Sequence, residues 1–377
     1  MMEKTLPEVC IIQYGFPFDS SKFCSAEGVP LVRIRDVVRG YSETYTTEIA
    51  GENYIVNDGD LLIGMDGEFN IAYWKGGRAY LNQRVCRLIP REDVDRDYIF
   101  YYMPQALKAI EDATPFVTVK HLSAKQLSKI LIPLPDMSEQ QRISAVLRSV
   151  DRVIAMRKKE LDELTNLVKS RFIELFGMPG TDAFGWGLVP LGSTCNINPK
   201  KSLDSRLVSG AMVSFVPMPA VTEHGEIDAT AIKEYDEVKT GFTYFAENDV
   251  LFAKITPCME NGKGAVAKGL HNGIGFGSTE FHVLRPLSGK TDPYWIYTLT
   301  AFSQFRIDAA SNMTGSAGQR RVPASFLENY RVSLPPIELQ EQFAAFVEQT
   351  DKSKLAVQKG LQELEILKKS LMQQYFG

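Results

Sequence analysis

Two stretches of the chain carry hydrophobic residues at the spacing of a coiled-coil heptad. The first stripe runs from Ile143 to Leu175 in alternating steps of four and three residues, and eight of its ten positions are apolar. A second stripe, from Phe343 to Tyr375, is apolar at seven of ten positions. The predicted seam residues are Ile143, Leu147, Val150, Ile154, Leu161, Leu164, Val168 and Leu175 in the first stretch, and Phe343, Val347, Val357, Leu361, Leu364 and Leu371 in the second.

Signals for the two ends of a helix flank the first stripe. Pro135 ends an extended segment, Ser138 and Gln141 form a predicted capping box, and residues 177–180 (Gly-Met-Pro-Gly) stop the helix. A helix from Ser138 to Phe176 would be about 58 Å long at 1.5 Å per residue. Because this length exceeds the width of a small domain, the pattern favours a coiled-coil arm over an ordinary amphipathic helix on a globule.

The two stripes belong to an internal repeat. Residues 118–177 align without a gap with residues 318–377, and identical residues such as Gln140 and Gln340 recur at a constant offset. Upstream of the arms, NDGDLLIG (57–64) resembles ENDVLFAK (247–254), and DYIFYYM (97–103) resembles PYWIYTL (293–299). The chain therefore consists of a globule and a long helix, repeated once.

The pattern within each globule predicts an α+β fold. Short β-rich runs alternate with turn residues and are followed by a helical stretch. We predict globules at 1–131 and 181–331 and helical regions at 132–180 and 332–377. Pseudo-two-fold symmetry between the halves would make the two helices antiparallel, since each leaves its globule at the same place and must bury its seam on the other.

Composition narrows the class of protein. The chain has 377 residues, of which 44% are hydrophobic and 23% charged, as in folded globular proteins. It shows no signal peptide and no apolar run of membrane-spanning length, so we expect a cytoplasmic protein. The five cysteines include no CxxC pair and the four histidines are scattered, which disfavours disulfides and a metal site.

A search for catalytic motifs finds none. Lys290 and Thr291 follow a glycine, but Leu284 occupies the position of the first glycine of a phosphate-binding loop. The GxSxG, HExxH and GxGxxG patterns are absent, as is the Asn/Asp-Pro-Pro-aromatic motif of adenine methyltransferases. We therefore predict a binding module without catalytic residues.

Two segments of the second globule concentrate polar side chains in turns. They are KITPCMENGKG (254–264) and MTGSAGQRRVP (313–323), whose Arg, Lys, Asn and Gln side chains can pair with base edges and whose Ser and Thr can reach phosphates. Composition alone favours solvated loops for both segments. The corresponding first-half segment, GMDGEFN (64–70), is less basic. The candidate DNA contacts are Gln83, Arg84, Arg87, Lys120 and His121 in the first globule, and Lys254, Thr256, Asn261, Lys263, Thr314, Ser316, Gln319, Arg320 and Arg321 in the second.

The net charge of −4 restricts how such a chain could bind DNA. Phosphate neutralisation normally requires a basic face, and no segment of this sequence is strongly basic. Binding would have to use local patches, with a partner supplying much of the attraction to phosphates.

Long and specific strings of the sequence carry a family resemblance. They are the Leu-Pro turns that precede a Gln at the start of each helix, VSFVPM (213–218), GFTYFAENDVLFAKITPCMENGKGA (241–265), GFGSTEFHVLRP (275–286) and MTGSAGQRRVP (313–323). Over essentially its whole length, the chain resembles the specificity subunits of type I restriction-modification systems.

The resemblance implies a role for each part of the chain. The globules would be target recognition domains that each read half of a bipartite sequence in double-stranded DNA, and the helices would hold them apart and dock two adenine methyltransferase subunits. S-adenosylmethionine would be bound by the methyltransferase, and ATP and Mg by a restriction subunit that also translocates DNA. This chain itself would bind no cofactor or metal and would not contact a membrane.

One departure from the family pattern concerns the N-terminus. The second half opens with GWGLVPLGSTCNIN (185–198), a typical start for such a domain, whereas the first begins directly at about EVCIIQYGFPF (8–18). The sequence leaves open whether the first half has the corresponding strand. Two other functions also stay open: a coiled-coil interaction scaffold that does not touch DNA, which the acidic balance favours, and a DNA-cleaving enzyme with a recognition half.

Overall fold

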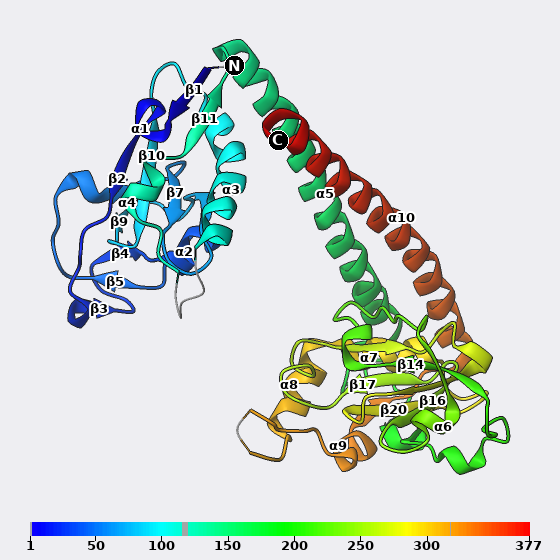
Figure 1. Ribbon diagram of the computed structural model, residues 1–377. Helices are drawn as coiled ribbons and strands as arrows, with labels where there is room; N and C mark the ends of the chain where they lie inside the picture. The colour runs from blue at the N-terminus through cyan, green and yellow to red at the C-terminus, as the bar shows by residue number, and fades with distance from the viewer. Residues whose placement is uncertain (1, 115–119, 317) are drawn as a thin grey trace. The chain divides into compact units, whose positions relative to one another are not determined.

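The computed structural model describes residues 2–114, 120–316 and 318–377, which form two compact units. The first unit comprises Met1–Met156 and Leu361–Gly377, and the second comprises Arg157–Gly360. Figure 1 labels many of the elements of both. Each unit contains one globule together with a segment of each long helix, so the compact units divide the chain inside the helices. The separate division into globules and helical regions stays a prediction.

The first unit combines strands and short helices. Its strands are β1 (Met2–Thr5), β2 (Cys10–Tyr14), β3 (Phe23–Cys24), β4 (Val29–Val32), β5 (Tyr45–Thr46), β6 (Ile55–Val56), β7 (Leu61–Gly64), β8 (Asn70–Tyr73), β9 (Ala79–Leu81), β10 (Val85–Pro90) and β11 (Leu131–Leu134). Its helices within the globule are α1 (Leu6–Val9), α2 (Ile34–Arg39), α3 (Arg96–Ala113) and α4 (Ala124–Leu127). The sheets have the strand orders β1-β11, β2-β10-β7-β8 and β3-β5-β4-β9-β6.

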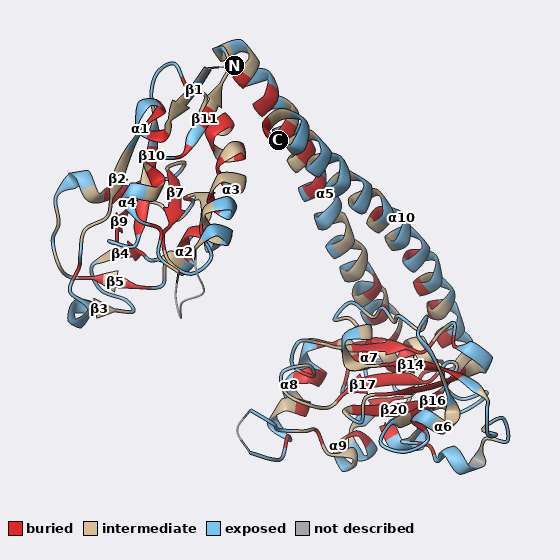
Figure 2. Ribbon diagram, in the orientation of Figure 1, coloured by how far each residue is buried: buried red, intermediate tan, exposed pale blue. Residues whose placement is uncertain are grey.

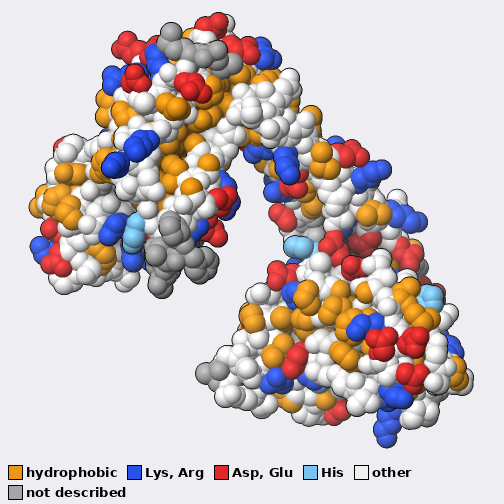
Figure 3. Space-filling view, viewed as in Figure 1, with side chains coloured by type: hydrophobic (Ala, Val, Ile, Leu, Met, Phe, Trp, Pro, Cys, Tyr) orange, Lys and Arg blue, Asp and Glu red, His pale blue; other side chains and the backbone are white. Residues whose placement is uncertain are grey.

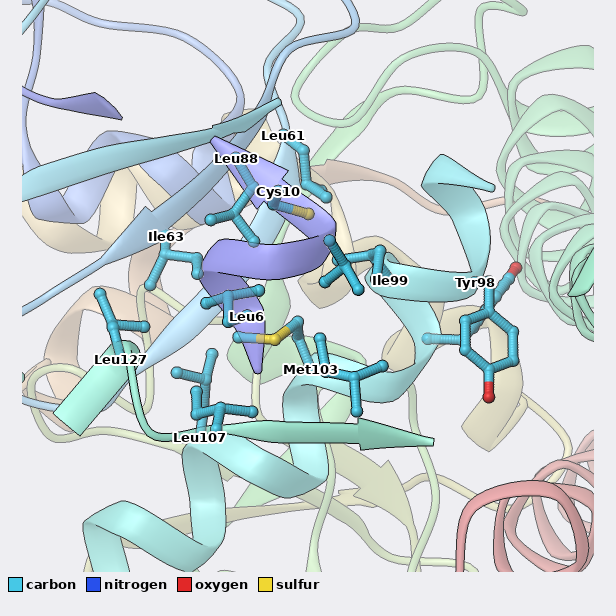
Figure 4. Packing of buried hydrophobic residues seen from close by; sticks show 14 of the residues in the cluster. Leu6, Cys10, Leu61, Ile63, Leu88, Tyr98, Ile99, Met103, Leu107 and Leu127 are labelled. Atoms are coloured by element: carbon cyan, nitrogen blue, oxygen red, sulfur yellow. The ribbon is translucent and has the colours of Figure 1, made fainter. Parts of the chain in front are cut away.

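The core of the first unit lies between α3 and the sheet that contains β7 and β10. Figure 4 shows Leu61, Ile63 and Leu88 of the sheet facing Ile99 and Met103 of α3. Leu6 of α1 and Leu127 of α4 complete the same cluster. Cys86 and Leu88 of β10 belong to this cluster, as expected for side chains two residues apart on one face of a sheet, whereas Val85 is buried in a different cluster.

The second unit repeats this architecture. Its strands are β12 (Leu188–Pro190), β13 (Cys195–Ile197), β14 (Met212–Val216), β15 (Ile232–Glu234), β16 (Thr243–Ala246), β17 (Val250–Ala253), β18 (Gly264–Val266), β19 (Ile274–Gly277), β20 (Phe281–Pro286) and β21 (Arg331–Ser333). Its helices within the globule are α6 (Tyr235–Val238), α7 (Pro293–Ala301), α8 (Ser303–Ser311) and α9 (Ala324–Asn329). The strand orders β12-β21, β13-β20-β17-β18 and β15-β14-β19-β16 correspond to those of the first unit, including one parallel pair in each, β4 with β9 and β14 with β19.

The first unit possesses the N-terminal strand that its sequence left open. In β1, Glu3 pairs with Pro133, and in the second unit Leu188 of β12 pairs with Ser333. Pro133 and Ser333 are equivalent positions of the repeat, so the register is the same in both units. The first globule therefore has a strand that corresponds to β12 of the second.

The two long helices are α5 (Met137–Phe176) and α10 (Ile337–Phe376), and each has 40 residues. The first begins one residue earlier than predicted, because Asp136 and not Ser138 caps it. The Asp136 carboxylate accepts the Glu139 backbone N–H at 2.9 Å and the Ser138 hydroxyl at 2.6 Å. The predicted capping box of Ser138 with Gln141 is therefore wrong.

A glutamine fixes the start of each long helix to its globule. The Gln140 side chain is buried, accepts the Asp95 backbone N–H at 2.8 Å and donates to the Pro135 carbonyl at 2.9 Å. Gln340 does the same in the second unit, with the Asp292 N–H and the Pro335 carbonyl. This contact explains why the glutamine recurs in both halves: its amide satisfies backbone groups that would otherwise be buried without partners.

Within each unit the two helices run antiparallel. In the first unit, Arg142 near the start of α5 lies over the ring of Tyr375 near the end of α10, and Asp151 forms an ion pair with Lys368 at 2.6 Å. In the second unit, Phe172 near the end of α5 packs edge to face against Phe343 near the start of α10. Buried residues line the facing sides of both helices (Figure 2).

The seam residues differ in burial along the helices. The buried ones are Ile143, Leu147, Val150, Ile154, Val168, Phe343, Val347 and Val357, and the half-buried ones are Leu161, Leu164, Leu175, Leu361, Leu364 and Leu371. Phe172 and Phe176 lie outside the predicted stripe, yet both are buried where the helices meet the second globule. The predicted stripe is therefore most buried where the helices contact the globules, and Phe172 and Phe176 add to it near the end of α5.

No helix in the described ranges combines the length and the hydropathy needed to cross a bilayer. Cys10, Cys86 and Cys195 are buried, and the five cysteines are unpaired. Burial raises the pKa of each of these three thiols to about 12, so they are protonated and unreactive at neutral pH.

Candidate nucleic-acid interface

The second unit brings together the two polar loops that the sequence singled out. The Thr256 backbone N–H donates to the Arg320 carbonyl at 3.0 Å, which joins the loop after β17 to the loop before α9. On its other side, segment 320–322 pairs with Thr314, because the Arg321 and Thr314 backbones exchange hydrogen bonds of 2.8 and 2.9 Å. Arg321 is therefore the centre of three paired backbone segments, opposite Ile255 and Thr314.

A carboxylate lies beside this centre. Both oxygens of Glu280 accept hydrogen bonds from Arg321, from Nε at 2.9 Å and from Nη2 at 2.8 Å. These bonds hold the pKa of Glu280 below its ordinary value, whereas burial lowers the pKa of the neighbouring Lys254. The site thus contains a charged pair with defined geometry, since a bidentate carboxylate fixes the plane of a guanidinium.

A buried arginine supports the first of these loops from behind. Arg306 of α8 is only 6% exposed and donates to the carbonyls of Met259 (2.9 Å) and Gly262 (3.3 Å). Burial lowers its pKa to about 10, so it remains charged at neutral pH. The loop is consequently held at its back by a helix and at its edge by segment 320–322, which leaves its outer side chains in a fixed place.

Segments 254–256 and 320–322, which are joined through their backbones, are called the frame of the second unit. The remaining candidate DNA contacts of the second unit lie around this frame. Asn261, Thr314, Ser316, Gln319 and Arg320 are exposed, and Thr256 and Lys263 are half-buried. The Thr256 hydroxyl donates to Glu260 at 3.0 Å. All these residues are within the two joined loops, so the structure brings the predicted contacts of this half into one place.

The first unit contains the same backbone frame with different side chains. The Gly67 N–H donates to the Lys120 carbonyl and the Leu122 N–H to the Met65 carbonyl, at 2.9 and 2.7 Å. These bonds match those of Thr256 with Arg320 and of Val322 with Lys254 in the second unit. Segments 65–67 and 120–122 are therefore the equivalents of 254–256 and 320–322.

The charges on the two frames are arranged differently. The first frame holds His121 at the position of Arg321, and Arg84 at the position of Glu280, as the matching backbone bonds of Met65 and Lys254 to these residues show. Its carboxylate, Asp66, lies 2.5 Å from His121 Nδ1 and 3.5 Å from Arg84 Nε. Each centre thus combines an acid with basic side chains, but at different positions, so the two loops present different patterns of donors and acceptors.

Three other candidates of the first unit have different surroundings. Arg87 is 16% exposed and donates to Gln13, to Asp60 and to the Ile55 carbonyl, so it is directed into the protein. This set of partners argues for a structural role, and we do not include Arg87 in the proposed interface. The Lys120 ammonium donates to the Glu111 carbonyl at 2.6 Å, and Gln83 is exposed next to Arg84.

Sequence reasoning missed Asp66 and Glu280, the two carboxylates at the centres of the frames. The search favoured basic and amide side chains, because these contact DNA most often. Glu280 is also 41 residues away from Arg321 in the chain. The available signal was the position of both carboxylates: Asp66 lies two residues after a buried strand and Glu280 directly precedes one.

We expect the second unit to lose stability as the pH falls below 6.5, because of His282. This histidine is buried behind segment 320–322; its Nε2 donates to the Val322 carbonyl at 2.8 Å, and its Nδ1 accepts from Asn198 at 3.0 Å. Burial lowers its pKa below the ordinary 6.5; the hydrogen bond to the Val322 carbonyl and the charge of Glu280 oppose this effect, and the charge of Lys254 reinforces it. The unfolded chain then binds more protons than the folded one below pH 6.5, so stability is complete above 6.5 and declines towards the lower folded pKa.

Thermal unfolding followed by tryptophan fluorescence between pH 5 and 8 measures this effect. The His282→Gln variant should lose the pH-dependent component, and the control variant of the exposed His271, His271→Gln, should keep it. An unchanged pH profile in His282→Gln would show that another group is responsible.

The described residues offer no site for a metal ion: no group of three or more His, Cys, Asp or Glu side chains among them is arranged to bind one. Acidic and basic side chains alternate over the visible faces of both units (Figure 3). The arrangement is therefore suited to contacts with a polar surface through small patches.

The relatives found by sequence match less than half of this chain. The EcoEI, EcoBI and EcoAI type I restriction enzyme specificity subunits of Escherichia coli are 42%, 40% and 41% identical over 153, 167 and 158 residues. These stretches are 40%, 44% and 42% of this chain, and they span only 25%, 35% and 26% of the length of the relatives.

Solved structures share the fold over the whole length. The type I restriction-modification system S subunit from M. genitalium has a TM-score of 0.55 at 14% identity, and the comparison covers 98% of this chain and 94% of that one. A chain from a study of complex assembly and conformational transition of the type I R-M system has a TM-score of 0.53 at 19% identity and covers 100% of this chain and 97% of its own. At these identities the likeness concerns the fold.

The duplicated architecture also corresponds to a duplicated family match. Residues 1–166 and 185–366 each match the family described as the type I restriction modification DNA specificity domain. The two matches cover both globules and most of both long helices. This chain belongs to the type I restriction-modification DNA specificity family.

Proposed function

We propose that the chain is the DNA-specificity subunit of a type I restriction-modification complex and acts in the cytoplasm. Its two globules read the two halves of a bipartite site in double-stranded DNA. The antiparallel helices connect them and dock two adenine methyltransferase subunits and, where present, restriction subunits. The chain performs no chemistry itself: S-adenosylmethionine is bound by the methyltransferase, and ATP and Mg by the restriction subunit.

One observation carries this proposal: the two units share one backbone frame and differ in the side chains at its centre. A frame of this kind is what a reader of two unlike half-sites requires, because position is set by the backbone and preference by the side chains. Identical readers related by symmetry would select a palindrome. Two unlike readers select an asymmetric site instead.

The proposed interface consists of the exposed and half-buried polar residues of the two frames. In the second unit it comprises Lys254, Thr256, Asn261, Lys263, Thr314, Ser316, Gln319, Arg320 and Arg321, and in the first Gln83, Arg84, Lys120 and His121. Because the chain carries a net charge of −4, we assign much of the attraction to phosphates to the methyltransferase partner.

Genome-wide mapping of methylated adenines tests the proposal. Cells that express the partner methyltransferase together with this chain should acquire adenine methylation in one asymmetric bipartite motif, and cells that express either protein alone should not. The purified chain should neither methylate nor cut DNA in the presence of S-adenosylmethionine, magnesium and ATP. A motif that does not depend on the chain would instead favour a scaffold that does not bind DNA, and turnover by the chain alone would show that it is an enzyme.

A further inference from the structure

We propose that Arg321 reads a guanine in its half-site through the outer edge of its guanidinium, and that Glu280 is a positioning residue that orients this edge. The inference rests on the proposed function, since it names the base that one residue of the second frame recognises. It assigns different roles to Arg320 and Arg321, which are neighbours in the sequence. The contacts of the second unit distinguish them.

A count of the donors of Arg321 shows which edge is available. A guanidinium has five N–H groups in one plane. Nε and one N–H of Nη2 face Glu280, and one N–H of Nη1 donates to the Gln319 carbonyl at 3.0 Å. Among the described residues, one N–H on Nη1 and one on Nη2 have no acceptor. The Arg321 side chain is 41% exposed, so these two donors remain accessible.

We take these two donors to be the adjacent pair at the outer end of the guanidinium, which matches the major-groove edge of guanine. Guanine presents two acceptors there, O6 and N7, and an arginine can contact both at once. Adenine presents one acceptor and one donor, and its donor would oppose a guanidinium N–H. The available edge therefore selects guanine over adenine.

The backbone of Arg321 is fixed before any DNA is bound. Its N–H and carbonyl both pair with Thr314, at 2.8 and 2.9 Å, and the adjacent Arg320 carbonyl accepts the Thr256 N–H at 3.0 Å. Glu280 is held in turn, because its carbonyl accepts the Lys254 N–H at 2.9 Å. Side-chain freedom is thus already restricted in the free protein, so binding loses less conformational entropy.

Arg320 lacks these restraints. Its side chain is exposed and makes no hydrogen bond or ion pair with the residues that the structure describes. An arginine that must be ordered on binding is suited to a phosphate, which accepts donors from many directions. We therefore assign Arg320 to the DNA backbone.

The first unit shows that this arrangement belongs to one half only. There His121 takes the position of Arg321, and Arg84 takes that of Glu280. Among the described residues, no guanidinium at the centre of that frame is held by two bonds to a carboxylate, since Arg84 Nε lies 3.5 Å from Asp66. The guanine preference is accordingly expected in the half-site of the second unit.

Duplexes that contain 7-deazaguanine test the inference. After the motif is mapped, each guanine of the second half-site is replaced in turn, which removes N7 and leaves base pairing intact. Binding by the reconstituted complex with methyltransferase is then measured. The wild type should lose affinity about 2- to 12-fold at one guanine, because the analogue removes one of the two acceptors that Arg321 contacts and leaves O6 in place. This loss of affinity caused by 7-deazaguanine is called the analogue penalty. In Arg321→Ala the analogue penalty should disappear.

Three matched variants separate positioning from direct contact. Glu280→Gln should reduce the analogue penalty, and Glu280→Gln added to Arg321→Ala should change it no further, because Glu280 acts through Arg321. Arg320→Ala should keep the full penalty while weakening all sequences alike and lowering the dependence on salt. Thermal unfolding of each variant monitors the fold.

The outcomes distinguish this inference from the proposed function. If the chain still directs a bipartite motif but Arg321→Ala retains the analogue penalty, or if no guanine of that half-site is sensitive, the inference is wrong and the proposed function stands. A uniform loss of affinity in Arg321→Ala would assign Arg321 to a phosphate and also overturn the inference. If no motif depends on the chain, the proposed function fails first.

Discussion

Replacement of Phe172 by alanine is expected to destabilise the second unit by about 3–5 kcal/mol, the usual cost of removing a buried aromatic side chain. Phe172 is 1% exposed, and its ring packs against those of Phe176, Phe302 and Phe343 at 5.0, 5.2 and 5.5 Å. It thus joins α5, α10 and the globule. Urea unfolding followed by the fluorescence of the buried Trp295 measures the change.

The neighbouring Ile173 provides the control. Its side chain is 38% exposed on the other side of α5, so Ile173→Ala should cost much less. Equal losses in the two variants would mean that the aromatic cluster does not hold the helices to the globule.

Removal of Arg285 is expected to cost about 3–5 kcal/mol at neutral pH, because it leaves a buried carboxylate without its partner. The Asp249 side chain is 1% exposed and accepts two hydrogen bonds from Arg285, at 2.7 and 2.6 Å. Burial already raises the pKa of Asp249 even with the arginine present. In Arg285→Ala, the folded protein should therefore favour a protonated Asp249.

The pH dependence of this loss checks its cause. A carboxyl whose folded pKa lies above its unfolded value binds more protons in the folded state, so the deficit of Arg285→Ala should grow as the pH rises from about 4 towards neutrality. Asp249→Asn/Arg285→Ala should recover part of the stability and lose this dependence, since the amide can still accept the Ala246 N–H. A deficit that is the same at every pH would point to lost packing of the arginine stem.

The long helices could be predicted closely because their determinants are local. A period of 3.5 residues over ten positions identifies the coiled coil, and the 40-residue helices α5 and α10 follow it. The wrong prediction of the residue that caps α5 also concerned residues close together in the sequence. Asp136 and Ser138 are both good capping residues, and only the bond from the Glu139 N–H to Asp136 distinguishes them.

Strand β1 could not be recognised because its sequence, MEKT, lacks alternation of apolar and polar residues. It exists because its backbone pairs with β11, more than 120 residues later. A strand that is held by its peptide groups leaves no side-chain signal.

The candidate interface was predictable in composition and not in geometry. The loops around Lys254 and Arg321 were identified from their polar side chains, but their contact depends on backbone pairing between distant segments. Glu280 and Asp66 were missed for the same reason. Arg87 resembled a surface contact in sequence, yet Asp60 and Gln13 bind it inside the fold.

The matching backbone frames have a consequence for how such a protein can diversify. Backbone hydrogen bonds join segments 65–67 with 120–122 and 254–256 with 320–322, so these bonds place little demand on the side chains of the frame. A change at an exposed position such as Arg320 should alter stability by no more than about 0.5 kcal/mol. Under the proposed function, mutation can therefore alter the base preference of one half while the core and the other half are preserved, and a lineage can change its target in single steps without passing through an unfolded intermediate.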